Sequence, residues 1–259
     1  MSERTAPTRG FTDDWFSALG AAGVLSPAAR DALDREGFVV LPGPVHDSQM
    51  DRLRAAYDAA VASAAPADVR AGRSTTRVDD FVSRGEEFDG LYVHPPLLEA
   101  AAQIIGRPFK LSTLLARTLR SAAPADSLHV DVARHADAWP LVGFIFMVDA
   151  FRTDNGATRF VPGSHRRSDG PPDGVHDAGP EVPACGPAGS LLVFHGSTWH
   201  GHSANVSGEP RRSIQGAFIP RDASAAVDWR NRLQARTVGR LGALARYLLA
   251  LGDDSDQVG

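Results

Sequence analysis

Short apolar runs between residues 109 and 220 constrain the fold of this chain more than any other feature. Clusters of Gly, Pro, Asn and Asp separate the runs, and none approaches the roughly 18 apolar residues that span a bilayer. Runs of this length between turn residues are typical of β-strands. We therefore expect an antiparallel β body here. The runs are FKLSTLLA, PLVGFIFMVD, TRFVP, SLLVFH and RSIQGAFIP.

The sequence on either side of these runs predicts helices. Ser26 is suited to cap a helix whose first residue is a proline, and Gly37 is suited to end it. Apolar residues at helical spacing predict two more helices over 46–65 and 95–108. Other expected elements are a short helix over 13–23, a strand over 38–43, a loop over the polar stretch 65–80 and helices over 223–251.

The length of 259 residues favours one domain over the whole chain, 1–259, because typical domains hold about 150 residues. We expect an α-helical frame around a β-barrel or double sheet, which makes the fold class mainly β with flanking helices. Its expected parts are a flexible tail over 1–12, a mostly helical region over 13–108, a β core over 109–221, C-terminal helices over 222–251 and an acidic tail over 252–259.

Composition excludes several classes of partner. Lys and Arg number 27 against 31 Asp and Glu, which leaves a net charge of −4 and no basic excess for nucleic acid or a membrane surface. The single cysteine, Cys185, cannot form an internal disulfide, and the opening residues are polar rather than signal-like. The expected location is therefore the cytoplasm, and the expected partner is a small-molecule substrate.

His129 and Asp131 are separated by one residue, so on a strand both side chains would point to the same face and share one metal ion. A third histidine would complete the two-His-one-carboxylate set of non-haem Fe(II) oxygenases, which leaves coordination positions open. His195, His200 and His202 are the candidates. His195 is interpreted as a structural histidine of the strand, while His200 and His202 share strand parity, so periodicity does not choose between them.

Two arginines follow the histidines. If the stretch formed a hairpin centred on 205–206, Arg211 would pair with His200, whereas a turn centred on 207–208 would place it opposite Ala204. Either register brings a guanidinium near the histidines, where it could bind the carboxylate of a small keto-diacid through two hydrogen bonds. Arg211 and Arg212 would face opposite ways, so one of them is expected to lie at the solvated edge.

The segments H-V-D, TDNGATRFVPGSHRR and WHGHSANVSGEPRRS, in this order, resemble the phytanoyl-CoA dioxygenase (PhyH) family of Fe(II)/2-oxoglutarate-dependent oxygenases. The resemblance covers roughly residues 28–221. It implies a double-stranded β-helix (jelly-roll, cupin-like) core, with His129, Asp131 and His200 as Fe(II) ligands and Arg211 binding 2-oxoglutarate. The NGATRFVPGSH stretch would then be architectural, with turns at Asn155–Gly156 and Pro162–Gly163.

The resemblance also implies an activity. The chain would hydroxylate, or otherwise oxidise, a small molecule with O2 and 2-oxoglutarate as co-substrates, and would release succinate and CO2. A carboxylate at Asp131 argues for hydroxylation, because related halogenating enzymes carry Ala or Gly there. The expected substrate is a specialised metabolite, since no basic cluster for a coenzyme A tail is evident. Residues expected to reach the pocket are Arg117, Arg120, Trp139 and His202.

Two other readings stay open at this point. A Zn(II) hydrolase could use the same three ligands, but it would not need the arginine eleven residues after the last histidine. A non-catalytic small-molecule binding protein could retain the site as a relic. The Pro- and Gly-rich segment 168–189 is a candidate lid over the site, and Cys185 within it lacks a base that would make it a nucleophile.

Overall fold

The computed structural model of the protein describes residues 15–16, 19–133, 141–171 and 179–251. Both predicted tails, Trp139 and part of the candidate lid (172–178) lie outside these residues, as does part of the helix expected over 13–23. Within the described ranges, no helix is both long enough and apolar enough to cross a membrane.

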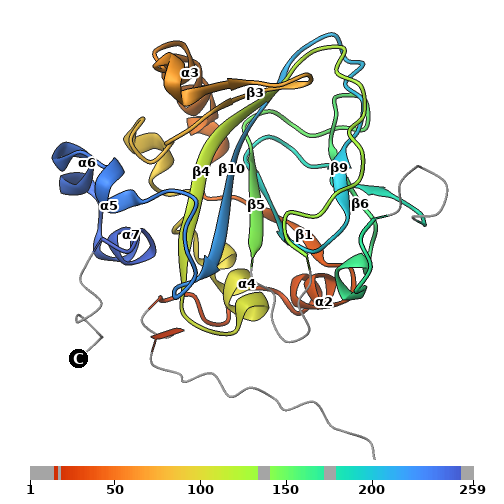
Figure 1. Ribbon diagram of the computed structural model, residues 1–259, viewed down its shortest axis with the longest axis horizontal. Helices are drawn as coiled ribbons and strands as arrows, with labels where there is room; N and C mark the ends of the chain where they lie inside the picture. Colours follow the sequence, from red (N-terminus) through yellow and green to blue (C-terminus); the bar gives the residue numbers. More distant parts are fainter. Residues whose placement is uncertain (1–14, 17–18, 134–140, 172–178, 252–259) are drawn as a thin grey trace, which may run out of the picture.

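A seven-stranded sheet forms the body of the molecule, and every pairing in it is antiparallel (Figure 1). Its strands lie in the order β1-β8-β5-β10-β4-β3-β2. The strands predicted from the apolar runs are confirmed, and the stretch predicted as a strand over 38–43 is the edge strand β1. The seven strands are β1 (Phe38–Pro42), β2 (Val69–Ala71), β3 (Thr75–Val78), β4 (Phe109–Leu119), β5 (Val142–Met147), β8 (Ser190–His195) and β10 (Arg211–Pro220).

The loop predicted over 65–80 is wrong, because β2 and β3 occupy it. These short strands form the edge of the sheet and expose much of their surface, so they carry polar side chains that read as a loop. Arg77 of β3 lies directly opposite Arg117 of β4 in the register. Because 65–80 was predicted to be a loop, the sequence did not identify Arg77 as a residue of the large sheet.

A second, three-stranded sheet faces the first across an apolar layer. Its strands lie in the order β7-β6-β9. Phe38 of the large sheet stacks on Phe160 of the small one, with ring centroids 4.3 Å apart, and Phe194 also contacts Phe160. Two antiparallel sheets facing each other in this way confirm the predicted jelly-roll core. The strands are β6 (Thr158–Phe160), β7 (Val182–Pro183) and β9 (His200–His202).

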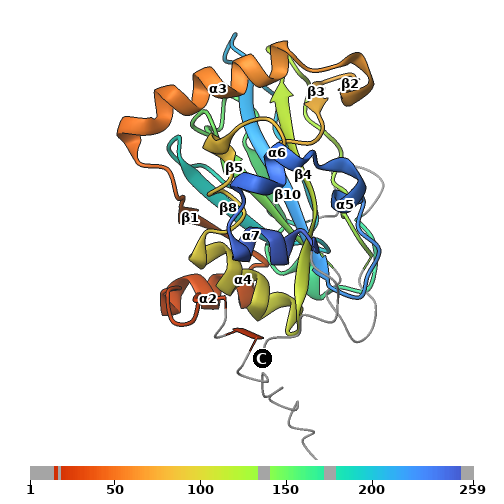
Figure 2. The ribbon, with the colours of Figure 1, turned by 90° about the vertical axis from the view of Figure 1, so that its left-hand side faces the viewer.

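Helices cover the other face of the large sheet (Figure 2). The first confirms its predicted signals: the Ser26 hydroxyl accepts from the N–H of Ala29 at 3.2 Å, and Gly37, just after the helix, has a φ of +87°. The helices are α2 (Pro27–Arg35), α3 (Met50–Ala62), α4 (Pro95–Ile105), α5 (Trp229–Arg232), α6 (Ala235–Arg240) and α7 (Ala243–Leu248), with 3-10 turns at Asp47–Gln49, Pro66–Asp68, Glu86–Phe88 and Ser164–Arg166.

Strand alternation decides which side chains reach the space between the sheets. In β4 the residues Thr113, Leu115 and Arg117 share one face, and the register places Ala217, Gln215 and Ser213 of β10 opposite them. Five of these six residues, all except Ser213, line an internal cavity, and Arg211, which shares the parity of the β10 residues, lines it as well. The site therefore lies on the inner face of the large sheet, opposite β9.

Candidate metal centre

Three side chains with metal-ligating atoms converge at the mouth of this cavity. Atoms of His129, Asp131 and His200 that can bind a metal all lie within 4.8 Å of one another. His129 and His200 form an antiparallel bridge in which each N–H donates to the carbonyl of the other residue, at 2.9 and 3.0 Å. The Asp131 N–H donates to the carbonyl of Gly196 at 2.8 Å. Backbone hydrogen bonds thus join two candidate ligands, His129 and His200, that are 71 residues apart in the sequence.

The predicted H-x-D strand is wrong in its local structure although the two side chains do come together. His129 belongs to an isolated bridge rather than to a named strand, and Asp131 lies on a bend that follows it. A bend rather than strand alternation therefore brings the carboxylate beside the imidazole. The distance from Asp131 Oδ1 to His200 Nε2 is 3.8 Å.

Backbone carbonyls orient both imidazole rings. His129 Nδ1 donates to the carbonyl of Ser127 at 3.2 Å, and His200 Nδ1 donates to the carbonyl of Thr198 at 2.8 Å. A carbonyl only accepts, so Nδ1 carries the hydrogen in each ring and Nε2 keeps its lone pair for a metal. Burial also lowers the pKa of His200, although the nearby Asp131 opposes this, and a neutral imidazole is the form that ligates.

Arg211 is buried inside the same cavity, at 2% exposure. Its guanidinium lies over the ring of Phe151, 3.8 Å from the centroid, and one of its Nη atoms donates to the carbonyl of Gly156. No partner within the described residues accepts from its Nε. Burial lowers the pKa of Arg211 to about 9, which leaves the side chain cationic at neutral pH.

Neither hairpin register expected for Arg211 is present. His200 lies in β9, which pairs with β6 of the small sheet, whereas Arg211 begins β10 and lies opposite Leu119 of β4. The chain between them crosses from one sheet to the other, so the arginine reaches the histidines across the cavity and not along a hairpin. Arg212 faces the opposite way, as expected, and forms ion pairs with Asp149 and Asp58.

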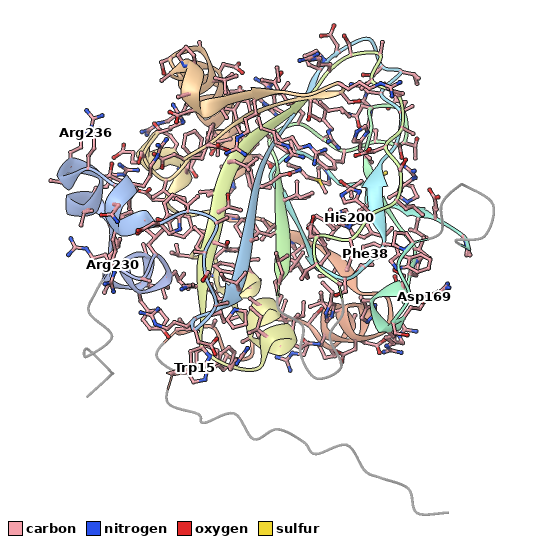
Figure 3. All side chains as sticks on the ribbon, viewed as in Figure 1. Trp15, Phe38, Asp169, His200, Arg230 and Arg236 are labelled. Carbon is pink, nitrogen blue, oxygen red and sulfur yellow. The ribbon has the colours of Figure 1, made fainter. Side chains whose placement is uncertain are left out.

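The cavity has a volume of about 280 Å³ and combines charged and apolar walls. In Figure 3, His200 of β9 lies on the side of that strand that faces the large sheet, well away from Arg230 and Arg236 on the outer helices. The described residues that line the cavity are Arg77, Thr113, Leu115, Arg117, His129, Asp131, Leu141, Gly143, Phe144, Ile145, Thr158, Phe194, His200, Gly201, His202, Arg211, Gln215, Gly216 and Ala217.

Of the other residues expected at the pocket, Arg117 and His202 line it and Arg120 does not. Arg120 directly follows β4, and its side chain is exposed. One of its Nη atoms lies 3.5 Å from the hydroxyl of Thr76 on β3. Trp139 lies outside the described residues.

His202 and His195 differ in their surroundings. Burial lowers the pKa of His202, whose Nδ1 donates to the carbonyl of Ser203 at 3.0 Å and whose Nε2 lies 3.7 Å from a carboxylate oxygen of Asp126. His195 is buried outside the cavity lining and stacks on His165, with centroids 4.6 Å apart. This placement agrees with the structural role expected for His195.

Residues of the cavity that the sequence did not indicate include Arg77, Gln215, Leu141 and Phe194. Gln215 and Phe194 lie within apolar strands, and strand parity would have placed Gln215 on the face of Arg211. The β-branched run Thr75, Thr76 and Val78 is the signal that could have identified β3 and with it Arg77.

The architectural turns are as predicted. Asn155 accepts from the N–H of Arg152 at 2.8 Å, and Gly156 has a φ of +79°, a conformation that favours glycine. The Gly156 carbonyl is the group that Arg211 contacts, so this turn supports the arginine. Gly163, in the second turn, has a φ of +77°. The C-terminal part of the candidate lid segment, 168–189, contains β7, which pairs with β6.

Comparisons with known proteins agree with this architecture. Dioxygenase trt7 of Aspergillus terreus is 27% identical over 209 residues, which cover 74% of this chain and 72% of that protein. Several other curated relatives are matched over about half of their own length, between 44% and 54%.

Solved structures show the same fold at low identity. HygX from Streptomyces hygroscopicus, whose structure contains nickel and 2-oxoglutarate, has a TM-score of 0.64 at 16% identity, with 78% of this chain and 90% of that chain covered. SnoK, described as a non-heme alpha ketoglutarate dependent carbocyclase from nogalamycin biosynthesis, has a TM-score of 0.65 at 18% identity, with 82% and 92% covered.

The family comparison covers most of the chain, from the end of the first helix to the strand that carries Arg211. Residues 33–213 match the model of the phytanoyl-CoA dioxygenase (PhyH) family. This stretch includes all three candidate ligands and the buried arginine. The chain is therefore a member of the phytanoyl-CoA dioxygenase family.

Proposed function

We propose that the protein is a non-haem Fe(II)/2-oxoglutarate-dependent oxygenase that hydroxylates, or otherwise oxidises, a small molecule. His129, Asp131 and His200 are the proposed iron ligands, and Arg211 is the proposed partner of the distal carboxylate of 2-oxoglutarate. The observation that carries the proposal is that the buried guanidinium of Arg211 lines the same cavity as the His-Asp-His cluster.

The donor set fits the proposed metal. Two neutral imidazoles and one carboxylate on one side of a cavity are the ligand types of non-haem Fe(II) sites, which keep positions open for substrates. The fixed Nδ1 hydrogen bonds of both histidines aim Nε2 away from the backbone. The residues fit the co-substrate as well. The buried Arg211 Nε has no hydrogen-bond partner among the described residues, and a carboxylate of 2-oxoglutarate would provide one.

When bound, Fe(II) with 2-oxoglutarate and O2 supplies the oxidising power for C–H bond cleavage, with succinate and CO2 as by-products. The chain contributes binding, orientation and exclusion of water. Arg211 holds the distal carboxylate in a buried position, where a charge-assisted pair is stronger than in water. Leu115, Leu141 and Phe194 supply apolar walls that keep the reacting volume dry.

A specialised metabolite is the proposed type of substrate, and the cytoplasm is the proposed location. The descriptions of HygX with hygromycin B and of SnoK in nogalamycin biosynthesis support the first point, since both proteins share this fold. The cavity volume of about 280 Å³ suits a small molecule. The reducing location suits a chain with one cysteine.

The test is anaerobic reconstitution with Fe(II), followed by 2-oxoglutarate and then O2. We expect a visible charge-transfer band when 2-oxoglutarate is added, and succinate after O2 is admitted. His200→Ala should lose both signals, whereas the matched variant His46→Ala, on the exposed side of the molecule, should keep them. Hydrolysis supported by Zn(II) without 2-oxoglutarate would favour a hydrolase instead, and binding without succinate would favour a non-catalytic protein.

A further inference from the structure

The register of the sheet places two arginines side by side on the wall of the cavity. Arg77 of β3 is directly opposite Arg117 of β4, so both side chains leave the same face of the sheet. Both line the cavity that holds the candidate metal centre. Like charges directly opposite each other on neighbouring strands destabilise a sheet unless a third group offsets them.

Among the described residues, no carboxylate forms an ion pair with either arginine. Asp131 and Asp126 lie 3.8 and 3.7 Å from His200 and His202 instead, and both act on Arg117 only from farther away. The contact of Arg117 with Gln215 Oε1 is long, at 3.5 Å, and its buried Nε has no partner among those residues. Burial and the charge of Arg77 lower the pKa of Arg117 to about 10, which still leaves a cation at neutral pH.

The charge balance of the loaded cavity points the same way. The lining residues that the structure describes carry three arginine cations and one carboxylate, that of Asp131. Fe(II) would add two positive charges and 2-oxoglutarate two negative ones. By this count, two positive charges remain after the metal and the co-substrate are bound. Arg77 is exposed, whereas Arg117 is half-buried with a fully buried Nε, so an unpaired charge is costly at Arg117.

A second cavity, of about 260 Å³, adjoins the first and shares Arg77, Arg117 and His202 with it. Arg73 adds a third cation to its wall, and Asp126 is the one acidic side chain among its described lining residues. The arginine pair thus lies where the two cavities meet. On the metal side, apolar side chains such as Leu115 and Phe194 offer a surface for a non-polar body.

We propose that the substrate carries an anionic group, a carboxylate or a phosphate, which binds between Arg77 and Arg117 while its apolar part extends toward the candidate metal centre. Two guanidinium forks can bind such a group through several charge-assisted hydrogen bonds. The inference rests on the proposed function, because that function assigns 2-oxoglutarate to Arg211 and leaves this pair for the substrate.

The experiment uses inorganic sulfate as the probe and the Ni(II)-loaded protein, so that no turnover interferes. The affinity for 2-oxoglutarate is measured first by calorimetry, and sulfate is then titrated into the protein already saturated with 2-oxoglutarate. The variants are Arg77→Gln and Arg117→Gln. The matched control is Arg120→Gln, which removes the same charge nearby but outside both cavities.

We expect sulfate to bind the wild type and each variant of the pair to weaken it by about tenfold or more, while Arg120→Gln changes it by less than about twofold. The affinity for 2-oxoglutarate should change by less than about threefold in Arg117→Gln. No sulfate binding, or equal losses in all three variants, would overturn the inference.

A further result would redirect the assignment of the pair. If Arg117→Gln weakens 2-oxoglutarate as strongly as sulfate, the pair serves the co-substrate and the inference is wrong. If the wild type binds Ni(II) but not 2-oxoglutarate, the proposed function itself fails. Normal 2-oxoglutarate binding without sulfate binding removes only the present inference.

Discussion

Replacing Arg211 by methionine should stabilise the metal-free protein and remove most of its affinity for 2-oxoglutarate. The two effects have opposite signs because the side chain is buried as a charge and forms no ion pair with a carboxylate in the part of the chain that the structure describes. A residue kept only for the fold would not behave in this way. Methionine is flexible and apolar, so it can fill the space that the guanidinium leaves.

The magnitude follows from the surroundings of the side chain. Burial lowers the pKa of Arg211 from its usual value to about 9, and at about 1.4 kcal/mol per tenfold change in the proton equilibrium, keeping the charge costs about 5 kcal/mol. Contact with the Phe151 ring returns about 2 kcal/mol, and the hydrogen bond to Gly156 about 1 kcal/mol. The variant should therefore gain about 2 kcal/mol in the free energy of unfolding.

Loss of the partner for a buried carboxylate costs about 3–5 kcal/mol, so the dissociation constant of 2-oxoglutarate should rise by more than about a hundredfold. Urea denaturation of the metal-free protein gives the stability, and calorimetry on the Ni(II)-loaded protein gives the affinity.

Arg212→Met is the matched control, since it removes the same charge one residue away on the other face of β10. It breaks the ion pairs with Asp149 and Asp58 and should cost about 1–3 kcal/mol of stability without changing 2-oxoglutarate affinity. The reasoning is refuted if Arg211→Met is less stable than the wild type and still binds 2-oxoglutarate normally.

Three further predictions concern the metal, the core and acid stability. His129→Ala should fail to retain iron after anaerobic loading and desalting, as measured by metal analysis, because one of three ligands is missing; iron content equal to the wild type would contradict the ligand assignment. Gly216→Ala would place a Cβ 2.2 Å from the Phe144 ring, so we expect a loss of about 1–3 kcal/mol in urea denaturation, and an unchanged midpoint would show that the ring can move away. Burial lowers the pKa of His195 from its usual 6.5 to about 3, so its contribution to stability is complete above pH 6.5 and is lost as the pH falls. From pH 7 to pH 5 this loss should be about 2 kcal/mol in the metal-free protein, and His195→Gln should reduce that slope; parallel slopes would exclude His195 as the cause.

The sequence predicted those elements whose own residues determine them. The helix α2 has its cap, its proline and its stop within one short stretch, so its limits could be predicted from Ser26 and Gly37. The apolar runs of β4, β5, β8 and β10 are buried strands whose composition leaves few alternatives. The candidate ligands were found through the family resemblance, because spacing alone left His200 and His202 equivalent.

What the sequence could not provide is the pairing between distant segments. The stretch from His200 to Arg211 looks like a hairpin, yet its two ends join different sheets, because β9 pairs with β6 and β10 pairs with β4 and β5. The short strand β3 that carries Arg77 has too few apolar residues to be distinguished from a loop. Its position opposite Arg117 depends on the sheet register, which no local pattern encodes.

The mutual hydrogen bonds between the backbones of His129 and His200 have a consequence for how the protein acquires its metal. Two ligands are already joined by main-chain atoms that need no ion to hold them, so their separation is set when the chain folds. Treatment with a chelator should then leave the circular dichroism spectrum intact and allow a different divalent ion to enter the same place. Exchange of the metal would then leave the chain folded, unlike the collapse that follows chelation in a zinc finger.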